Sequence, residues 1–183
     1  GYGPEDKIEW LSPLRTDAYA EYRDKAFLDR LGVTLLHHSL SDFWPKRGPV
    51  WDGLACGPRG EPILVEAKAH IPELYSPASA ASDASLASIR ASLSRTKKVF
   101  GSTAKHDWAG PLYQYTNRLA HLHLLRSLNR LPAYLAFLCF TNARDVAGPN
   151  SVAEWAGALR LVHTILGLRE SALSRYVIHV FVD

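Results

Sequence analysis

The chain has 183 residues, 47% hydrophobic and 21% charged, which suits one globular domain over residues 1–183 with a core of its own. Its longest apolar runs, Ala133–Phe140 and Tyr176–Val182, are far shorter than the roughly 18 residues of a membrane-spanning helix. Because neither run could span a bilayer, we expect no membrane partner. The formal net charge of +3 is mildly basic and by itself hardly separates nucleic-acid-binding proteins from others.

The first part of the chain is predicted to form a helix. Ser12-Pro13 or Thr16-Asp17 can begin it, and an apolar pattern through Phe27 and Leu31 ends at Gly32. The short apolar segment after it is predicted as a first strand, with a continued helix as the alternative, and covers Val33–His38.

A β-hairpin is predicted next. Its strands, Pro49–Ala55 and Pro62–Ala69, are joined by the turn-forming sequence Gly57-Pro58-Arg59-Gly60. Ser76–Ser85 consists almost wholly of small and turn-forming residues, which predicts a mobile loop.

The second half alternates between helices and strands. Two helices are predicted over Leu86–Phe100 and Leu112–Leu131, the first with a basic outer face and the second packed on more than one side. An apolar strand over Ala133–Thr141, an amphipathic helix over Val152–Leu166 and a strand over Tyr176–Val182 predict a βαβ unit with parallel strands. The predicted fold class is therefore α/β, with a mixed sheet of an antiparallel hairpin and parallel strands, flanked by helices.

The hairpin carries the residues with the clearest chemistry. Glu66 and Lys68 lie two apart on one strand and so share a face, and Asp52 lies on the adjacent strand. If Pro58-Arg59 forms a two-residue loop, Asp52 faces Val65 and the two carboxylates diverge. A three- or five-residue loop, or a bulge, makes them converge. Converging carboxylates can bind a divalent metal that neutralises phosphate and activates water.

Asp52 followed by Glu66-Ala67-Lys68 at the end of an apolar strand resembles the motif of the PD-(D/E)XK nuclease superfamily, whose members have the restriction-endonuclease-like fold. The element order also resembles that fold over most of the chain. The sequence departs from the name-giving motif, because Trp51 precedes Asp52 and Pro49 stands three residues upstream.

The resemblance implies a Mg²⁺ or Mn²⁺ site whose ligands are Asp52, Glu66 and the Ala67 carbonyl. It implies that Lys68 positions the attacking water or stabilises developing charge. An acid from the first helix often joins such sites, and here the candidate is Glu21. The alternative for Glu21 is a solvent-facing ion pair with Lys25.

Other residues are candidates for contacts with a substrate. Gln114 and Arg118 share one helix face; the resemblance favours Gln114 as the residue that orders the lysine or water, and Arg118 is predicted to bind a phosphate. The basic residues Arg95, Lys97 and Lys98, near Trp108, can follow a phosphate backbone with some stacking, although such runs are more often a solvated helix face.

The sequence thus predicts a metal-dependent nuclease that hydrolyses phosphodiester bonds, and DNA is expected as its substrate rather than RNA. The alternatives are an inactive module of the same fold that binds nucleic acid or a protein partner, and a nuclease that acts in a homodimer or larger assembly. In another alternative Glu66 and Lys68 are only a surface ion pair. Cys56 and Cys139 form neither a CxxC pair nor a disulfide framework, and the start, Gly1–Asp6, lacks a secretory pattern, so we expect a cytoplasmic protein.

Overall fold

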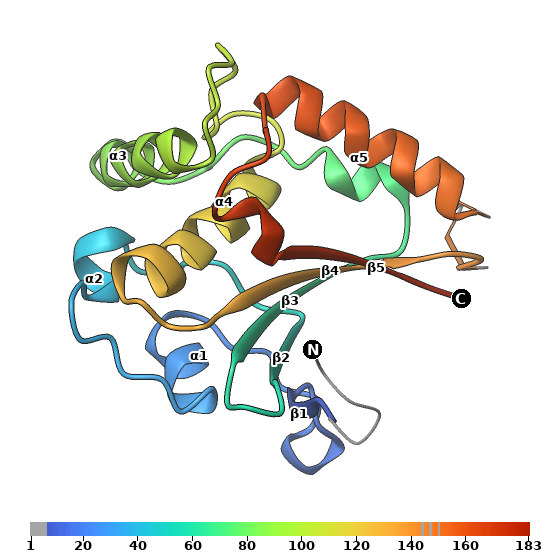
Figure 1. Cartoon of the computed structure of the whole chain (residues 1–183), viewed down its shortest axis with the longest axis horizontal. Coiled ribbons are helices and arrows are strands. Elements are labelled where there is room, and N and C mark those ends of the chain that lie inside the picture. The colour runs from blue at the N-terminus through green and yellow to red at the C-terminus, as the bar shows by residue number, and fades with distance from the viewer. Residues whose placement is uncertain (1–6, 144, 147, 150) are drawn as a thin grey trace.

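The computed structural model of the chain describes residues 7–143, 145–146, 148–149 and 151–183, so that Gly1–Asp6 lies outside it. Its elements form a five-stranded mixed sheet in the spatial order β1-β2-β3-β4-β5, flanked by helices (Figure 1). This confirms the α/β class. The strands are β1 (Glu9–Ser12), β2 (Gly53–Cys56), β3 (Pro62–Lys68), β4 (Tyr134–Phe140) and β5 (Val177–Val182).

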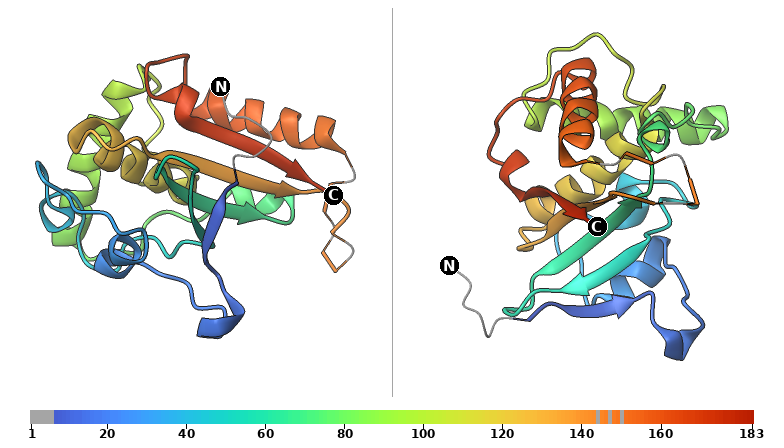
Figure 2. Two further views of the ribbon diagram at one scale, coloured as in Figure 1. Left: turned by 60° about the horizontal axis from the view of Figure 1, so that its bottom comes forward. Right: turned by 90° about the vertical axis from the view of Figure 1, so that its right-hand side faces the viewer.

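The helices are α1 (Asp24–Arg30), α2 (Leu40–Phe43), α3 (Asp83–Val99), α4 (Tyr113–Leu122) and α5 (Val152–Leu166). Four further helical segments of 3₁₀ or π type accompany them in the described residues: η1 (Arg15–Asp17), η2 (Ile71–Leu74), η3 (His123–Leu128), which continues α4 as a π-helix, and η4 (Ser174–Tyr176). Helices α3, α4 and α5 lie on one side of the sheet (Figures 1 and 2). No helix in the described part of the chain is both long and apolar enough to cross a bilayer.

The sheet changes from antiparallel to parallel at β3, as predicted. Strands β1, β2 and β3 pair antiparallel, whereas β3 pairs parallel with β4, and β4 with β5. The segment β4-α5-β5 is the predicted βαβ unit. Strand β4 is buried along most of its length, which agrees with its continuous apolar sequence.

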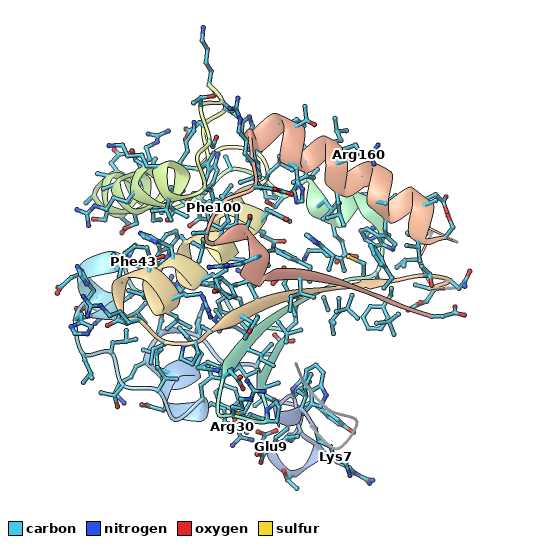
Figure 3. All side chains as sticks on the ribbon, viewed as in Figure 1. Lys7, Glu9, Arg30, Phe43, Phe100 and Arg160 are labelled. Atoms are coloured by element: carbon cyan, nitrogen blue, oxygen red, sulfur yellow. The ribbon has the colours of Figure 1, made fainter. Side chains whose placement is uncertain are left out.

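The core lies between the sheet and the helices. Phe43 and Phe100 contribute to it with 3% and 1% of their surface exposed, whereas Lys7, just before β1, and Glu9, its first residue, lie on the outside (Figure 3). The largest buried side chains, Trp51 and Trp155, come from the hairpin segment and from α5. The core therefore joins both halves of the sequence.

The prediction for the first part of the chain is wrong in two places. A helix was predicted from Ser12 or Thr16, but Glu9–Ser12 is a strand and α1 begins only at Asp24. Tertiary pairing outweighs the helical pattern here, because Trp10 pairs with Ala55 and Tyr22 forms a bridge with Trp51.

The strand predicted over Val33–His38 does not form. The backbone N–H groups of His37 and His38 instead donate to Oδ1 of Asn129, at 3.0 and 3.1 Å. A single side chain thus satisfies two backbone donors, and no neighbouring strand is needed.

The loop predicted over Ser76–Ser85 is shorter than expected, because α3 already begins at Asp83. The later elements agree with their predicted positions. Helix α5 covers the predicted range, and the ends of α3, β4 and β5 differ from the predictions by no more than a few residues.

Candidate active site

The register of the hairpin brings the two predicted carboxylates together. Gly53 lies opposite Val65 and Cys56 opposite Pro62, so residues 57–61 form a five-residue loop. One step further along this register, Asp52 lies opposite Glu66. The structure therefore realises the converging arrangement that the sequence left open.

Local contacts hold this loop in place. The Gly57 N–H donates to the carbonyl of Glu61 at 2.8 Å, and the Gly60 N–H to the carbonyl of Gly57 at 2.9 Å. Gly60 has a φ of +83°, a conformation that favours glycine. A Cβ on Gly57 would lie only 2.6 Å from Glu61 Oε2, so the Glu61 carboxylate, which accepts a hydrogen bond from the Arg59 N–H, would have to move.

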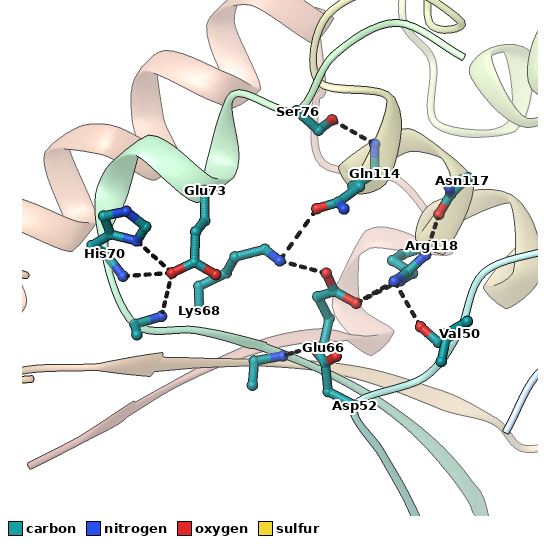
Figure 4. Close-up of polar contacts among 12 residues, drawn as sticks. Val50, Asp52, Glu66, Lys68, His70, Glu73, Ser76, Gln114, Asn117 and Arg118 are labelled. Carbon is teal, nitrogen blue, oxygen red and sulfur yellow. Dashed lines mark hydrogen bonds and ion pairs between the residues drawn. The ribbon is translucent and has the colours of Figure 1, made fainter. Parts of the chain in front are cut away.

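Glu66 lies between two cations (Figure 4). Its Oε1 accepts a hydrogen bond from Lys68 Nζ at 2.6 Å, and its Oε2 one from Arg118 Nε at 2.6 Å. The Glu66 side chain is only 2% exposed, and those of Lys68 and Arg118 are 9% and 6% exposed. The interpretation of Glu66 and Lys68 as a surface ion pair is wrong, because both side chains are buried.

Lys68 is directed by a second acceptor. Its Nζ donates to Oε1 of Gln114 at 3.4 Å, and Gln114 is anchored where its backbone N–H donates to Ser76 Oγ at 2.8 Å. An ammonium group has three N–H donors, so two acceptors leave one donor for another ligand. Gln114 thus contacts the lysine that the resemblance expects it to order.

Arg118 holds several backbone and side-chain groups at once. Besides Glu66, its guanidinium donates to the carbonyl of Val50 at 2.9 Å and to Asn117 Oδ1 at 2.8 Å, and it lies 5.0 Å from the ring centre of Trp51. These bonds occupy much of the donor capacity that the predicted phosphate contact would need.

Asp52 is bound on one side only. Its Oδ2 accepts a hydrogen bond from the Ala67 N–H at 2.7 Å, while its Oδ1 has no hydrogen-bond partner among the described residues. Burial, and then the negative charge of Glu66, raise the pKa of Asp52. An additional cation beside this carboxylate would offset both effects.

These residues line a single cavity of about 710 Å³. Its wall includes Asp52, Glu66, Ala67 and Lys68 from the hairpin and Gln114 and Arg118 from α4. A cleft that combines buried charges with a shifted pKa is where catalytic chemistry is expected.

Glu21 also lines this cavity. It belongs to the segment before α1, so its predicted position within the first helix is wrong. Glu21 is exposed, as its alternative held, but the pairing with Lys25 is wrong, because Lys25 pairs with Asp29 at 2.5 Å.

One acid of the cavity, Glu73, was not predicted from the sequence. Its Oε1 accepts hydrogen bonds from the backbone N–H groups of Ala69 and His70, both at 3.0 Å, and contacts His70 Nδ1 at 2.5 Å. Burial opposes the shift, but these hydrogen bonds lower the pKa of Glu73. The sequence held one signal, since Glu73 follows closely on Lys68 at the end of the strand.

The three basic residues predicted to bind a phosphate backbone lie elsewhere. Arg95, Lys97 and Lys98 belong to α3, and none of them lines the cavity. Lys97 donates to the carbonyls of Ala104 and His106, and Trp108 is only 2% exposed, so the predicted stacking on Trp108 is wrong.

The donor set fits a hard divalent cation. Asp52 and Glu66 supply carboxylate oxygens, and the Ala67 carbonyl can add a third. The described residues contain no group of three or more His, Cys, Asp or Glu side chains arranged to hold a metal. Mg²⁺ needs no such group, because it is commonly bound by one or two carboxylates together with water and substrate phosphates. The free Oδ1 of Asp52 is consistent with this mode of binding.

Comparisons of the chain with models of known protein families, with curated proteins and with solved structures give no match. The function is therefore inferred from the site itself.

Proposed function

We propose that this chain is a metal-dependent nuclease of the PD-(D/E)XK superfamily, with the restriction-endonuclease-like fold. It hydrolyses phosphodiester bonds, and its substrate is DNA rather than RNA. The observation that carries the proposal is the convergence of Asp52, Glu66 and Lys68 in one cavity, produced by the five-residue hairpin loop. The order of antiparallel and parallel strands around β3 supports the fold assignment.

Bound Mg²⁺ or Mn²⁺ would neutralise phosphate charge and make a bound water more acidic. Asp52, Glu66 and the Ala67 carbonyl would hold the ion, and Glu21, which lines the same cavity, can add a carboxylate. Lys68, fixed by Glu66 and Gln114, keeps one N–H donor to orient the attacking water or to stabilise charge on a phosphate oxygen.

One observation favours a second candidate, the inactive module that binds nucleic acid or a protein partner. Each oxygen of Glu66 is already bonded to a buried cation, so its charge is compensated without a metal. Each oxygen keeps a second lone pair for Mg²⁺, but the two neighbouring cations repel the ion and so weaken its binding. The two candidates differ in metal binding and in cleavage, and both can be measured.

The test is cleavage of single- and double-stranded DNA and RNA with Mg²⁺ or Mn²⁺. Asp52→Asn and Lys68→Ala should each lower the rate by at least about 100-fold, because each removes a group that acts on the reacting phosphate or water. Asp42→Asn and Lys46→Ala are matched controls, since both residues are exposed and lie outside the cavity wall.

Cleavage that persists in both site variants would place the chemistry elsewhere and reject the proposal. If the native protein binds no Mg²⁺ or Mn²⁺ in calorimetry and cuts none of the substrates, the inactive module is favoured.

A further inference from the structure

We infer that Arg47 binds a substrate phosphate at the cavity, a role that the sequence suggested for Arg118. This inference rests on the proposed function, because it names the group that recognises the anionic backbone of the substrate. The inference rests on the position of Arg47, whose free side chain lines the same cavity as Asp52 and Lys68.

Three cationic side chains line the cavity: Arg47, Lys68 and Arg118. Lys68 and Arg118 are buried and both are bonded to Glu66. The side chain of Arg47 is exposed and makes no hydrogen bond or ion pair with the described residues. Its guanidinium can therefore bind a phosphate without first breaking an internal bond.

The backbone at Arg47 is fixed although its side chain is free. The carboxylate of Asp24 accepts hydrogen bonds from the N–H groups of Arg47 and Gly48, at 3.1 and 2.8 Å. Arg47 has a φ of +65°, a conformation that costs energy for an arginine and that the Asp24 contacts help to maintain. Asp24 thus fixes the backbone at the cavity wall from which the Arg47 side chain extends.

The charges of the cavity also call for such a residue. Four carboxylates line it, from Glu21, Asp52, Glu66 and Glu73, against the three cations. These acids repel an approaching phosphate, and the two cations bonded to Glu66 offset that repulsion only in part. The Arg47 guanidinium forms no ion pair with the described residues, and its planar shape allows two hydrogen bonds to one phosphate.

The experiment measures binding of fluorescently labelled DNA and RNA oligonucleotides by anisotropy at several salt concentrations. Ca²⁺ replaces Mg²⁺, because it takes the same oxygen ligands with looser geometry, and a gel checks that the oligonucleotide stays intact. Arg47→Ala should weaken binding about 10-fold near 0.1 M salt and lower the slope of log K against log salt by about one. Arg47→Lys, which keeps the charge, should recover part of the loss and the slope.

Lys46→Ala is the matched control. Lys46 is the neighbouring exposed cation, but it lines a different cavity, so its replacement should change binding less than about 2-fold. Equal effects of Arg47→Ala and Lys46→Ala, an unchanged salt slope in Arg47→Ala, or no binding by the native protein would each overturn the inference.

The two proposals can fail separately. If the native protein cuts nucleic acid and Arg47→Ala binds and cuts like it, the role of Arg47 is rejected and the nuclease function stands. If no substrate is cut but Arg47→Ala still loses binding with the smaller salt slope, the role of Arg47 stands and the nuclease function is rejected.

Discussion

Replacing Glu66 with glutamine should lower the free energy of unfolding by about 3–5 kcal/mol, because it leaves two buried cations without their counter-ion. The side chains of Lys68 and Arg118 are 9% and 6% exposed, so water can solvate their unpaired charges only a little. Glutamine keeps the size of the side chain, so the loss would report on charge rather than on a cavity. The measurement is urea unfolding in EDTA at neutral pH.

A double-mutant cycle identifies the cause of this loss. Adding Lys68→Met to Glu66→Gln removes one of the unpaired charges and should recover part of the stability. Glu170→Gln, at an exposed position, is the matched control and should change stability by less than about 0.5 kcal/mol. If Glu66→Gln costs no more than Glu170→Gln, the buried charge network contributes little, and the mutual positioning of Glu66, Lys68 and Arg118 must have another origin.

Acidification is expected to destabilise the protein through His121. This side chain is 1% exposed and lies among aromatic rings, with the ring centres of Trp44 and Trp51 at 5.0 and 5.8 Å. Burial lowers the pKa of His121 from 6.5 to about 4, although the hydrogen bond of its Nδ1 to the Asn117 carbonyl acts in the opposite direction. The unfolded chain therefore takes up the proton at a higher pH than the folded protein does.

The sign of the effect follows from this difference. The stability associated with a neutral His121 is fully present above about pH 6.5 and is lost as the pH falls toward 4, in total roughly 3 kcal/mol. Burial also lowers the pKa values of His123 and His179 to about 4, so these two side chains add to the loss in the same pH range.

Urea unfolding at pH values above 6.5 and near 4.5 tests this expectation in the native protein and in His121→Phe. Phenylalanine keeps a ring among the aromatic neighbours but cannot take up a proton, so the fall in stability should be clearly smaller in the variant. His37→Gln, at an exposed position, is the control and should behave like the native protein. Equal losses in native protein and His121→Phe would contradict the assignment to His121.

Sequence patterns were most informative where local chemistry and tertiary structure agree. The apolar run of β4, the amphipathic pattern of α5 and the turn residues between β2 and β3 each suit the place that the element takes in the fold. They failed in the first part of the chain, where Trp10 and Tyr22 pair with the hairpin segment and outweigh a helical pattern. A residue's own preference amounts to a few tenths of a kcal/mol, which such pairing readily exceeds.

The candidate site shows the same division. The period of two along a strand was enough to put Glu66 and Lys68 on one face, and the spacing of four was enough to put Gln114 and Arg118 on one helix face. Neither period could show which cationic side chains would be bonded to an internal acid and which would be available for a phosphate. Arg118 was expected to be available for phosphate, yet in the fold it is bonded to Glu66, whereas Arg47 drew no attention because nothing in its neighbouring sequence marks it.

The sequence by itself determined the α/β class, the order of the later elements and the presence of two acids and a lysine on a hairpin, because these depend on short-range periodicity and on turn-forming residues. Only the tertiary structure decided that the loop has five residues and sets Asp52 opposite Glu66, that Glu73 joins the cavity and that Trp108 is buried. Local contacts hold the loop and Glu73, but their place in the cavity and the burial of Trp108 depend on how the strands and helices pack against one another, which no sequence period shows. The roles of the buried charges Glu66, Lys68 and Arg118 follow from this packing, since a buried charged side chain is held by the partners that the fold brings to it.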